Sequence, residues 1–341
     1  MNAHLNFCTL FDKGFLIKGL ALHHSLSTHI GKFTLWILCM DDLTYQTLEK
    51  LRLQNVQLIT LKEFEDDELK EIKKTRSQRK YFFTISPSLP LYILTYKNVE
   101  HITYLDADLY FFSSPEIIYK EMGAHSIMII PHNLVATRKA KEKEVGTYNV
   151  GMLIFRNDTY ALECLHWWRM QCNLYCDDTE RPGHYDDQGY LDYFEEKFKG
   201  VYILKNRGAN VAPWNIQGMP IYTKEKEVYV GPDKLVFFHF SGFGLYPRSM
   251  ILPYGPQTFR EYTRSSPAKD LMYKPYAQCL YQMLESVRTV EPDWQYGVIV
   301  RPGFKQNSEQ FFNNSIYYPG RRLVKTILSP LLKKIKTKQL L

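Results

Sequence analysis

Two aspartates separated by one residue, Asp106 and Asp108, are the side chains of this sequence best suited to chemistry. They follow the apolar run at 102–105, which is typical of a strand buried in a parallel sheet. Extended backbone would point both carboxylates the same way, at the sheet edge where ligands bind. Carboxylate oxygens suit Mg²⁺ or Mn²⁺, and a diphosphate can complete the coordination. Taken alone, so short a pattern is more typical of a strand followed by an acidic turn.

The surrounding elements favour the chemical interpretation, because strands and helices alternate along the chain. Buried strands are predicted at 5–11, 33–40 and 56–60, with helices at 15–28 and 43–53 between them. This alternation predicts a parallel, doubly wound sheet. An apolar helix is expected at 81–96, and further strands at 126–131, 148–156, 201–204 and 235–240. No Gly-x-Gly-x-x-Gly follows the first strand, which argues against an ordinary dinucleotide dehydrogenase.

The motif at 104–108, Tyr-Leu-Asp-Ala-Asp, is followed by two phenylalanines at 111–112 and by Ser-Pro at 114–115. This stretch resembles the metal-binding strand end of GT-A type glycosyltransferases. Other segments resemble the retaining galactosyl- and glucosyltransferases of family eight and their bacterial relatives. The resemblance implies an α/β fold with a Rossmann-like, mixed but mainly parallel sheet flanked by helices. It also implies a catalytic domain at 1–255, to which we add an extension packed on it at 256–320 and a basic amphipathic tail at 321–341.

His239 precedes Ser-Gly, and this His-x-x-Gly resembles the family motif whose imidazole is the third protein ligand of Mn²⁺. A lone histidine in such a place is otherwise usually a packed, hydrogen-bonded residue. Neutral imidazole added to two carboxylates favours Mn²⁺ over Mg²⁺, although either ion is possible. The family pattern continues with a lysine that contacts phosphate. This chain lacks that lysine, and Arg248 is expected to replace it as a bidentate phosphate donor.

The resemblance also assigns residues to the donor sugar and to the chemical step. Asp187 and Gln188 resemble the Asp-Gln pair beside the anomeric carbon, although helix capping by one aspartate is the alternative. Asn149 resembles the asparagine that hydrogen-bonds the donor sugar, and Gly151 would let backbone come close to the ligand. The other residues expected to contact the nucleotide sugar are Thr9, Phe11, Asp12, Lys80, Asp106, Ala107, Asn210 and Gly242. Trp214 and Asn215 are candidates for holding sugar hydroxyls and a ring face.

Two polar segments flank these motifs. The charged segment at 64–80 ends in a run of cations that includes Lys80. A solvated helix and loop is its ordinary interpretation, and a cationic lip over the diphosphate is the alternative. The segment at 133–146 alternates lysine and glutamate, and we expect it to be a mobile loop that covers the site.

Composition and charge bound the remaining possibilities. The chain has 341 residues, enough for one large α/β domain with a small extension. Its net charge of +7 resides in the tail at 321–341, so the main body does not suggest a nucleic-acid partner. We expect this tail to lie as an amphipathic helix on an anionic membrane surface, the alternative being a helix docked on the protein itself. Pro330 is expected to kink or divide that helix.

The cysteines and the start of the chain indicate a compartment. The first residues contain no basic region followed by a long apolar stretch, so no signal peptide is expected. No stretch is apolar enough to span a bilayer. The six cysteines are then expected to be free thiols in the cytoplasm, at the inner face of the cell membrane. Cys172 and Cys176 are one helical turn apart, but no matching pair lies nearby to complete a zinc site.

The implied reaction is metal-dependent transfer of a hexose from a nucleotide sugar, with UDP the expected nucleotide, to a hydroxyl of a glycan or lipid-linked acceptor. Retention of configuration and a role in bacterial surface polysaccharide or lipooligosaccharide synthesis are part of the same expectation. The metal would neutralise charge on the diphosphate leaving group. A catalytically inactive nucleotide-sugar-binding scaffold is the alternative. A dinuclear phosphohydrolase would need more histidine and aspartate clusters than this chain has. The sequence leaves open the donor sugar, acceptor, linkage and oligomeric state.

Overall fold

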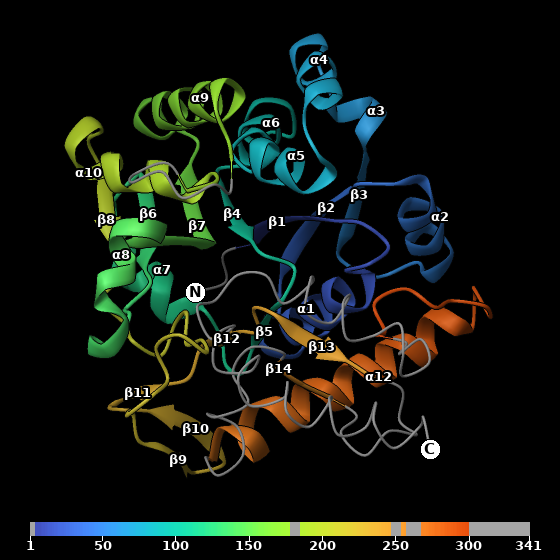
Figure 1. Cartoon of the computed structure of the whole chain (residues 1–341), viewed down its shortest axis with the longest axis vertical. Helices are drawn as coiled ribbons and strands as arrows, with labels where there is room; N and C mark the ends of the chain where they lie inside the picture. Colours follow the sequence, from blue (N-terminus) through green and yellow to red (C-terminus); the bar gives the residue numbers. More distant parts are fainter. Residues whose placement is uncertain (1–3, 178–184, 247–253, 257–266, 300–341) are drawn as a thin grey trace, which may run out of the picture.

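The computed structural model describes residues 4–177, 185–246, 254–256 and 267–299 (Figure 1). Its centre is a seven-stranded sheet with the strand order β3-β2-β1-β4-β7-β6-β8. The bounds of these strands are β1 Leu5–Phe11, β2 Phe33–Cys39, β3 Val56–Thr60, β4 His101–Leu105, β6 Ile127–Pro131, β7 Tyr148–Arg156 and β8 Val201–Ile203. Only β7 runs antiparallel to its neighbours, β4 and β6. The expected mixed, mainly parallel sheet is confirmed.

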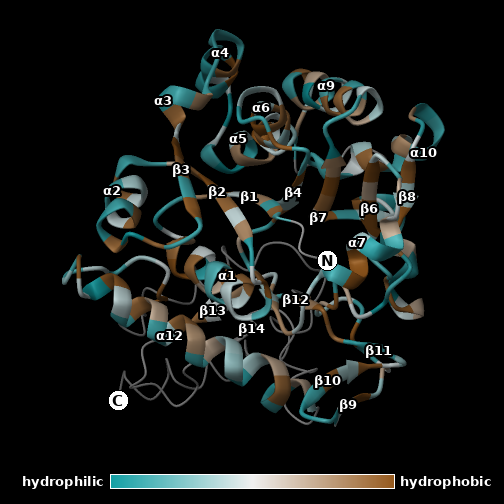
Figure 2. Ribbon diagram, turned by 180° about the vertical axis from the view of Figure 1, so that it is seen from behind, coloured by the Kyte–Doolittle hydropathy of each residue, from teal (hydrophilic) through white to brown (hydrophobic). Residues whose placement is uncertain are grey.

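Helices cover both faces of the sheet, which explains why its strands are nearly continuous apolar runs. One face carries α1 (Leu16–His29), α7 (Glu116–Met122) and α12 (Lys274–Arg288). The other face carries α5 (Gln78–Ile85), α6 (Ser88–Tyr96) and α9 (Thr159–Leu174). Figure 2 shows apolar colours concentrated in the strands, whereas α2 (Asp42–Leu51) and α4 (Asp67–Thr75) at the periphery are largely polar. A separate hydrophobic core therefore lies on each side of the sheet.

Three smaller sheets occur in the described residues beside the main sheet. In the first, β5 (Leu109–Phe111) pairs antiparallel with β12 (Phe237–His239). The second contains β9 Ile221–Lys224, β10 Glu227–Val230 and β11 Asp233–Lys234, and the third contains β13 Phe243–Leu245 and β14 Tyr254–Pro256. The remaining short helices are α3 Leu61–Phe64, η1 Ala136–Lys141, α8 Glu142–Val145, η2 Gln188–Tyr193, α10 Phe194–Lys197 and η3 Lys269–Tyr273. The β5–β12 pair matters most, because it joins segments that lie far apart in the sequence.

Three elements differ from the sequence-based expectation. The apolar helix expected at 81–96 is divided into α5 and α6, and Pro87 lies between them. Proline lacks the N–H that a continuous helix would need and clashes with the preceding turn. The segment at 133–146, expected to be a loop, contains η1 and α8. The expected strand at 235–240 is shorter and forms β12.

The described C-terminal part packs on the main body. Helix α12 lies along α1, and Tyr276 of α12 stacks on Phe240 with ring centroids 3.8 Å apart. The tail at 321–341 and Arg248 lie outside the described residues. All six cysteines are buried and free. No helix within the described residues is both long and apolar enough to cross a membrane.

Candidate active site

Asp106, Asp108 and His239 meet at the carboxyl edge of the central sheet. Asp106 follows β4 and Asp108 precedes β5, whose Leu109 pairs with His239 of β12. His239 Nε2 lies 3.2 Å from Asp108 Oδ1 and 3.6 Å from Asp106 Oδ2. One ligand atom from each residue lies within 4.8 Å of the others, which fits a divalent metal ion. No other group of this kind occurs among the residues that the structure describes.

The backbone between the two aspartates is a turn rather than the extended chain that we expected. The N–H of Leu109 donates to the carbonyl of Asp106 at 3.3 Å, and Ala107 is buried inside this turn. The N–H of Asp106 donates to the carbonyl of Gly151 on β7 at 3.0 Å. The turn, and not strand alternation, directs both carboxylates toward His239. The alternation argument was wrong because β4 ends one residue before the motif begins.

The electrostatics of the three groups also favour a cation. Burial raises the pKa of Asp106 to about 6, and the nearby Asp108 carboxylate adds to the rise while His239 opposes it. Burial alone would raise the pKa of Asp108, but Lys18 and His239 hold it well below its usual range. Burial would lower the pKa of His239, and the two carboxylates more than reverse that effect. Asp106 is the most accessible of the three, with 31% of its side chain exposed. A ligand can therefore approach from its side.

Asn149 on β7 determines which nitrogen of His239 faces the carboxylates. Its Oδ1 accepts from the N–H of Gly151 at 3.2 Å, which fixes the orientation of the amide. The same Oδ1 lies 3.3 Å from His239 Nδ1, so Nδ1 carries the proton and donates. Nε2 then faces Asp106 and Asp108, where it can coordinate a metal ion once it has lost its proton.

Gly151 is needed for this arrangement. A Cβ at this position would lie 2.6 Å from Asn149 Oδ1 and 2.9 Å from His239 Nδ1. Only glycine leaves room for the pair. We expected Gly151 to let backbone approach a ligand; in the structure it allows the close approach of Asn149 and His239.

Gln188 continues the hydrogen-bond chain away from Asp106, Asp108 and His239, the three residues called the metal cluster below. Asn149 Nδ2 donates to Gln188 Oε1 at 2.8 Å, and Gln188 Nε2 donates to the carbonyl of Val145 at 2.7 Å. Val145 is the last residue of α8. Gln188 thereby connects the metal cluster to the segment between β6 and β7.

Asp187 is a buried carboxyl beside this chain, only 3% exposed. Its backbone carbonyl accepts from Trp168 Nε1 at 2.8 Å. Burial raises its pKa well above the usual range, and the charges of Asp186 and Asp106 add to the rise. Its side chain makes no capping hydrogen bond to η2, so the capping alternative is not realised. A buried acid of perturbed pKa near a metal cluster is typical of a functional group.

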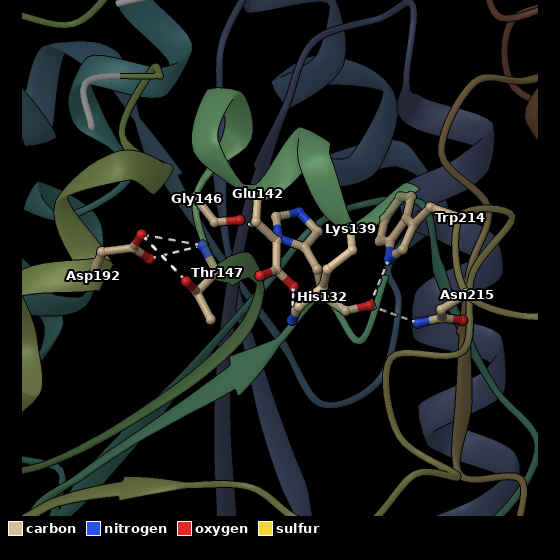
Figure 3. Close-up of polar contacts among 8 residues, drawn as sticks. All are labelled: His132, Lys139, Glu142, Gly146, Thr147, Asp192, Trp214 and Asn215. Atoms are coloured by element: carbon tan, nitrogen blue, oxygen red, sulfur yellow. Dashed lines mark hydrogen bonds and ion pairs between the residues drawn. The ribbon is translucent and has the colours of Figure 1, made fainter. Parts of the chain in front are cut away.

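His132 is joined to Trp214 and Asn215 by hydrogen bonds (Figure 3), and Trp214 lies beside His239. His132 Nδ1 lies 3.1 Å from the carbonyl of Gly146, to which it donates. The carbonyl of His132 accepts from Trp214 Nε1 at 3.0 Å and from Asn215 Nδ2 at 2.9 Å. The Trp214 ring lies edge-on to His239, with centroids 5.1 Å apart. The polar groups of Trp214 and Asn215, the candidates for holding sugar hydroxyls and a ring face, are engaged in hydrogen bonds within the protein.

Of the residues expected to bind the nucleotide, three lie at the end of β1. Thr9 is fully buried, and its hydroxyl has no hydrogen-bond partner among the residues that the structure describes. Phe11 is buried with its ring against Gly19, where an added Cβ would lie 2.3 Å from the ring. Asp12 is partly exposed and accepts from the N–H of Gly14 at 2.9 Å and from Gln78 Nε2 at 3.1 Å. The structure thus places Phe11 in the core and Asp12 toward solvent.

The remaining expected residues are dispersed. Lys80 pairs with Asp177 at 2.8 Å. Asn210 is fully buried with φ of 55° and donates to the carbonyl of Pro131 at 3.3 Å. Gly242, three residues after His239, has φ of 70°, a conformation that favours glycine.

Lys18 was not singled out from the sequence, although it contacts the metal cluster. Its Nζ lies 3.6 Å from Asp108 Oδ2, and only 13% of its side chain is exposed. A sequence signal existed, because Lys18 interrupts the apolar run of the first predicted helix. A lysine among buried helix positions needs an acidic partner, and the nearby strand end supplies one.

Comparison with known proteins finds two relatives from Bacillus subtilis strain 168. The uncharacterized protein YfnD is 30% identical over 299 residues, which cover 86% of this chain and 94% of YfnD. The uncharacterized protein YfnF is 28% identical over 296 residues, covering 84% of this chain and 95% of YfnF. No family model matches the chain.

Solved structures similar to the chain include three glycosyltransferases. Galactosyltransferase LgtC, in complex with donor and acceptor sugar analogs, has a TM-score of 0.47 and 11% identity, covering 89% of this chain and 99% of LgtC. Mouse xyloside xylosyltransferase 1 has a TM-score of 0.43 and 15% identity, covering 70% of this chain and 98% of its own. GlyE of Streptococcus pneumoniae TIGR4 has a TM-score of 0.40 and 15% identity, covering 60% of this chain. The chain spans 46% of GlyE's length.

Proposed function

The chain belongs to the same family as the uncharacterized protein YfnD of Bacillus subtilis, and we propose that it is a metal-dependent glycosyltransferase. It takes a hexose from a nucleotide sugar, in the simplest case a UDP-sugar, and transfers it to a hydroxyl of a glycan or lipid-linked acceptor. The observation that carries this proposal is the convergence of Asp106, Asp108 and His239 at the carboxyl edge of a mainly parallel sheet. Open α/β sheets bind their ligands at that edge.

The donor set supports a role for Mn²⁺, because an imidazole joins two carboxylates. When bound, such an ion neutralises the charge that grows on a diphosphate leaving group. The chain's own residues hold the ligands in place, since Asp108 and His239 are buried and Asn149 orients the imidazole. The exposed side of Asp106 leaves room for the diphosphate to approach.

Asp187 and Gln188 are the proposed groups beside the reacting carbon. The support is that the charge of Asp106 acts on the pKa of Asp187, which places the two carboxyls within electrostatic reach. Gln188 is hydrogen-bonded to Asn149, which in turn contacts His239. In this proposal the pair stabilises the positive charge that develops on the sugar ring. Transfer with retention follows from the family resemblance, and we assign no nucleophile.

The proposed setting is the synthesis of a bacterial surface polysaccharide or lipooligosaccharide. Its support is the basic and apolar pattern of the tail at 321–341, which suits an anionic membrane surface. A lipid-linked acceptor would then be concentrated near the enzyme.

The function is tested by screening UDP-, GDP- and ADP-linked hexoses for thermal stabilisation, with and without Mn²⁺. We expect one nucleotide class to raise the melting temperature only with Mn²⁺, and the same sugar to release nucleoside diphosphate when incubated with the protein. Stabilisation without any release would support the inactive scaffold instead. No stabilisation by any nucleotide sugar contradicts the proposed function.

A further inference from the structure

Lys18 occupies an unusual position for a lysine, in the first turn of α1 between buried residues. Its neighbours Leu16, Ile17 and Gly19 are all buried. Its Nζ lies 3.6 Å from Asp108 Oδ2 and 4.2 Å from the centre of the Phe15 ring. The aromatic face and the carboxylate together hold the ammonium group at the cluster.

The two oxygens of Asp108 have different partners. Oδ2 faces Lys18, whereas Oδ1 lies 3.2 Å from His239 Nε2 on the metal-facing side. Asp108 therefore retains an oxygen for a metal while Lys18 remains in contact with the other. Among the described residues, Lys18 is the only lysine or arginine in ion-pair contact with Asp106 or Asp108.

The charges of the site indicate how Lys18 could contribute to binding a diphosphate. The two negative charges of Asp106 and Asp108 cancel the two positive charges of a divalent ion, so without Lys18 a metal-loaded site would have no net charge to attract a diphosphate. The ammonium group leaves one positive charge in a largely buried place, where it interacts strongly with an anion. The lysine that the family places after the histidine motif is missing here, and Arg248, which is expected to replace it, lies outside the described residues. Lys18 is the cation that the structure places at the site.

The amino end of α1 adds to this field. Phe15, the residue before the helix, has no side chain that can cap it, and the first turn contains no acidic residue. The Asp12 carboxylate accepts from the N–H of Gly14 just before the helix, so it offsets part of the positive end of the helix dipole beside Lys18. A dianionic group suits such a place better than a cation does.

We propose that Lys18 is a positioning residue for the diphosphate of the nucleotide sugar, and that it supplies from α1 the positive charge that the family takes from its C-terminal motif. This inference rests on the proposed function. It predicts opposite effects of Lys18 on the affinities for the metal ion and for the nucleoside diphosphate. A fixed cation beside Asp108 opposes the binding of a metal ion and favours the binding of an anion to the metal-loaded site.

The test measures Mn²⁺ binding and nucleotide binding separately by calorimetry. The variants are Lys18→Met, which removes the charge, and Lys18→Arg, which keeps it. Lys70→Met is the matched control, because Lys70 is exposed on α4 and pairs only with Asp67 of its own helix in the ion pairs of the described residues. Mn²⁺ is titrated alone, and UDP, GDP, ADP and CDP are each titrated at saturating Mn²⁺. Melting temperatures verify that each variant is folded, and Lys18→Gln replaces Lys18→Met if the latter is not.

We expect Lys18→Met to bind Mn²⁺ as tightly as the wild type or more tightly, and to bind the preferred nucleoside diphosphate roughly tenfold or more weakly. Lys18→Arg and Lys70→Met should remain near the wild type. Unchanged nucleotide affinity in Lys18→Met overturns the inference, and so does an equal loss of Mn²⁺ and nucleotide affinity, which marks Lys18 as structural. If the wild type binds none of the four nucleotides, the proposed function fails together with the inference.

Discussion

Asn149 shows how a single residue determines the properties of the cluster. Its carbonyl oxygen accepts from both His239 and Gly151, so the amide cannot turn over without losing a hydrogen bond. A histidine whose Nδ1 is held in this way keeps Nε2 on the side of the two carboxylates, where a metal ion would take the place of the Nε2 proton. The family resemblance assigns Asn149 to the donor sugar, and the geometry adds a role in orienting the imidazole.

Replacing Asn149 tests this role. In Asn149→Ala the imidazole loses its acceptor, and we expect the affinity for Mn²⁺ to fall by about 10–100-fold. Asn149→Asp keeps an acceptor at the same position and should retain most of the affinity. Calorimetric titration of Mn²⁺ in the absence of nucleotide measures both. Wild-type affinity in Asn149→Ala would show that His239 needs no such support.

Asp187 is the residue on which the chemical step is predicted to depend. The change Asp187→Asn keeps the shape but leaves a side chain that cannot ionise, so turnover should fall by roughly two to three orders of magnitude. Nucleotide affinity should change little, because the proposed diphosphate contacts lie at Asp106, Asp108 and His239. Steady-state kinetics and nucleotide titration on the same variant separate the two. An equal loss of affinity and rate would make Asp187 a donor-binding or structural residue.

At the scale of elements, the segment between β6 and β7 is closed by contacts at its two ends. His132, just after β6, donates to Gly146, and the N–H of Thr147 donates to both oxygens of Asp192 at 2.9 and 3.1 Å (Figure 3). Gln188 holds the end of α8 between them. These contacts join the end of α8 and the start of β7 to His132, Gln188 and Asp192, in the segment that the sequence predicted to be a mobile loop.

The hydrogen bond from His132 to Gly146 predicts how the free energy of unfolding depends on pH. Burial lowers the pKa of His132 to about 4, below its usual value in the unfolded chain. Neutral His132 therefore makes its full contribution to the free energy of unfolding above about pH 6.5. This contribution decreases as the pH falls toward 4, by up to about 3 kcal/mol, because the unfolded chain binds the proton more readily. His132→Asn keeps a donor for Gly146 but cannot titrate in this range. Its free energy of unfolding should fall less than that of the wild type between pH 7 and 5, and parallel curves in denaturant titrations would contradict the assignment.

At the scale of the whole molecule, the sequence predicted most of the strands and all three members of the metal cluster. Apolar runs identify β1, β2 and β4, because strands buried on both faces have no polar side. The pattern around Lys18 indicates a buried lysine but not its partner, and the turn at Asp106 was not predictable in the same way. His239 reaches this turn through the pairing of β5 with β12, a contact between segments that local patterns do not connect. The division of the helix at 81–96 was predictable from Pro87, although the apolar pattern obscured it.

The basic tail at 321–341 carries a prediction for the whole chain. If it binds an anionic membrane, the full chain should float with anionic vesicles but not with neutral ones, and less as salt rises. A shortened chain ending at Gly320 should lose this binding, because all seven excess charges lie beyond it. Equal flotation of the two proteins, or flotation of neither, would contradict a membrane role for the tail.

The most direct test of the whole account is the metal dependence of nucleotide-sugar turnover in the wild type and in a variant with both Asp106→Ala and Asp108→Ala. Melting temperatures establish that the variant is folded. We predict that the wild type releases nucleoside diphosphate from its preferred nucleotide sugar with Mn²⁺ and stops in EDTA, and that the variant releases none in either condition. Turnover by the double variant in EDTA would show that Asp106, Asp108 and His239 are not a catalytic metal site.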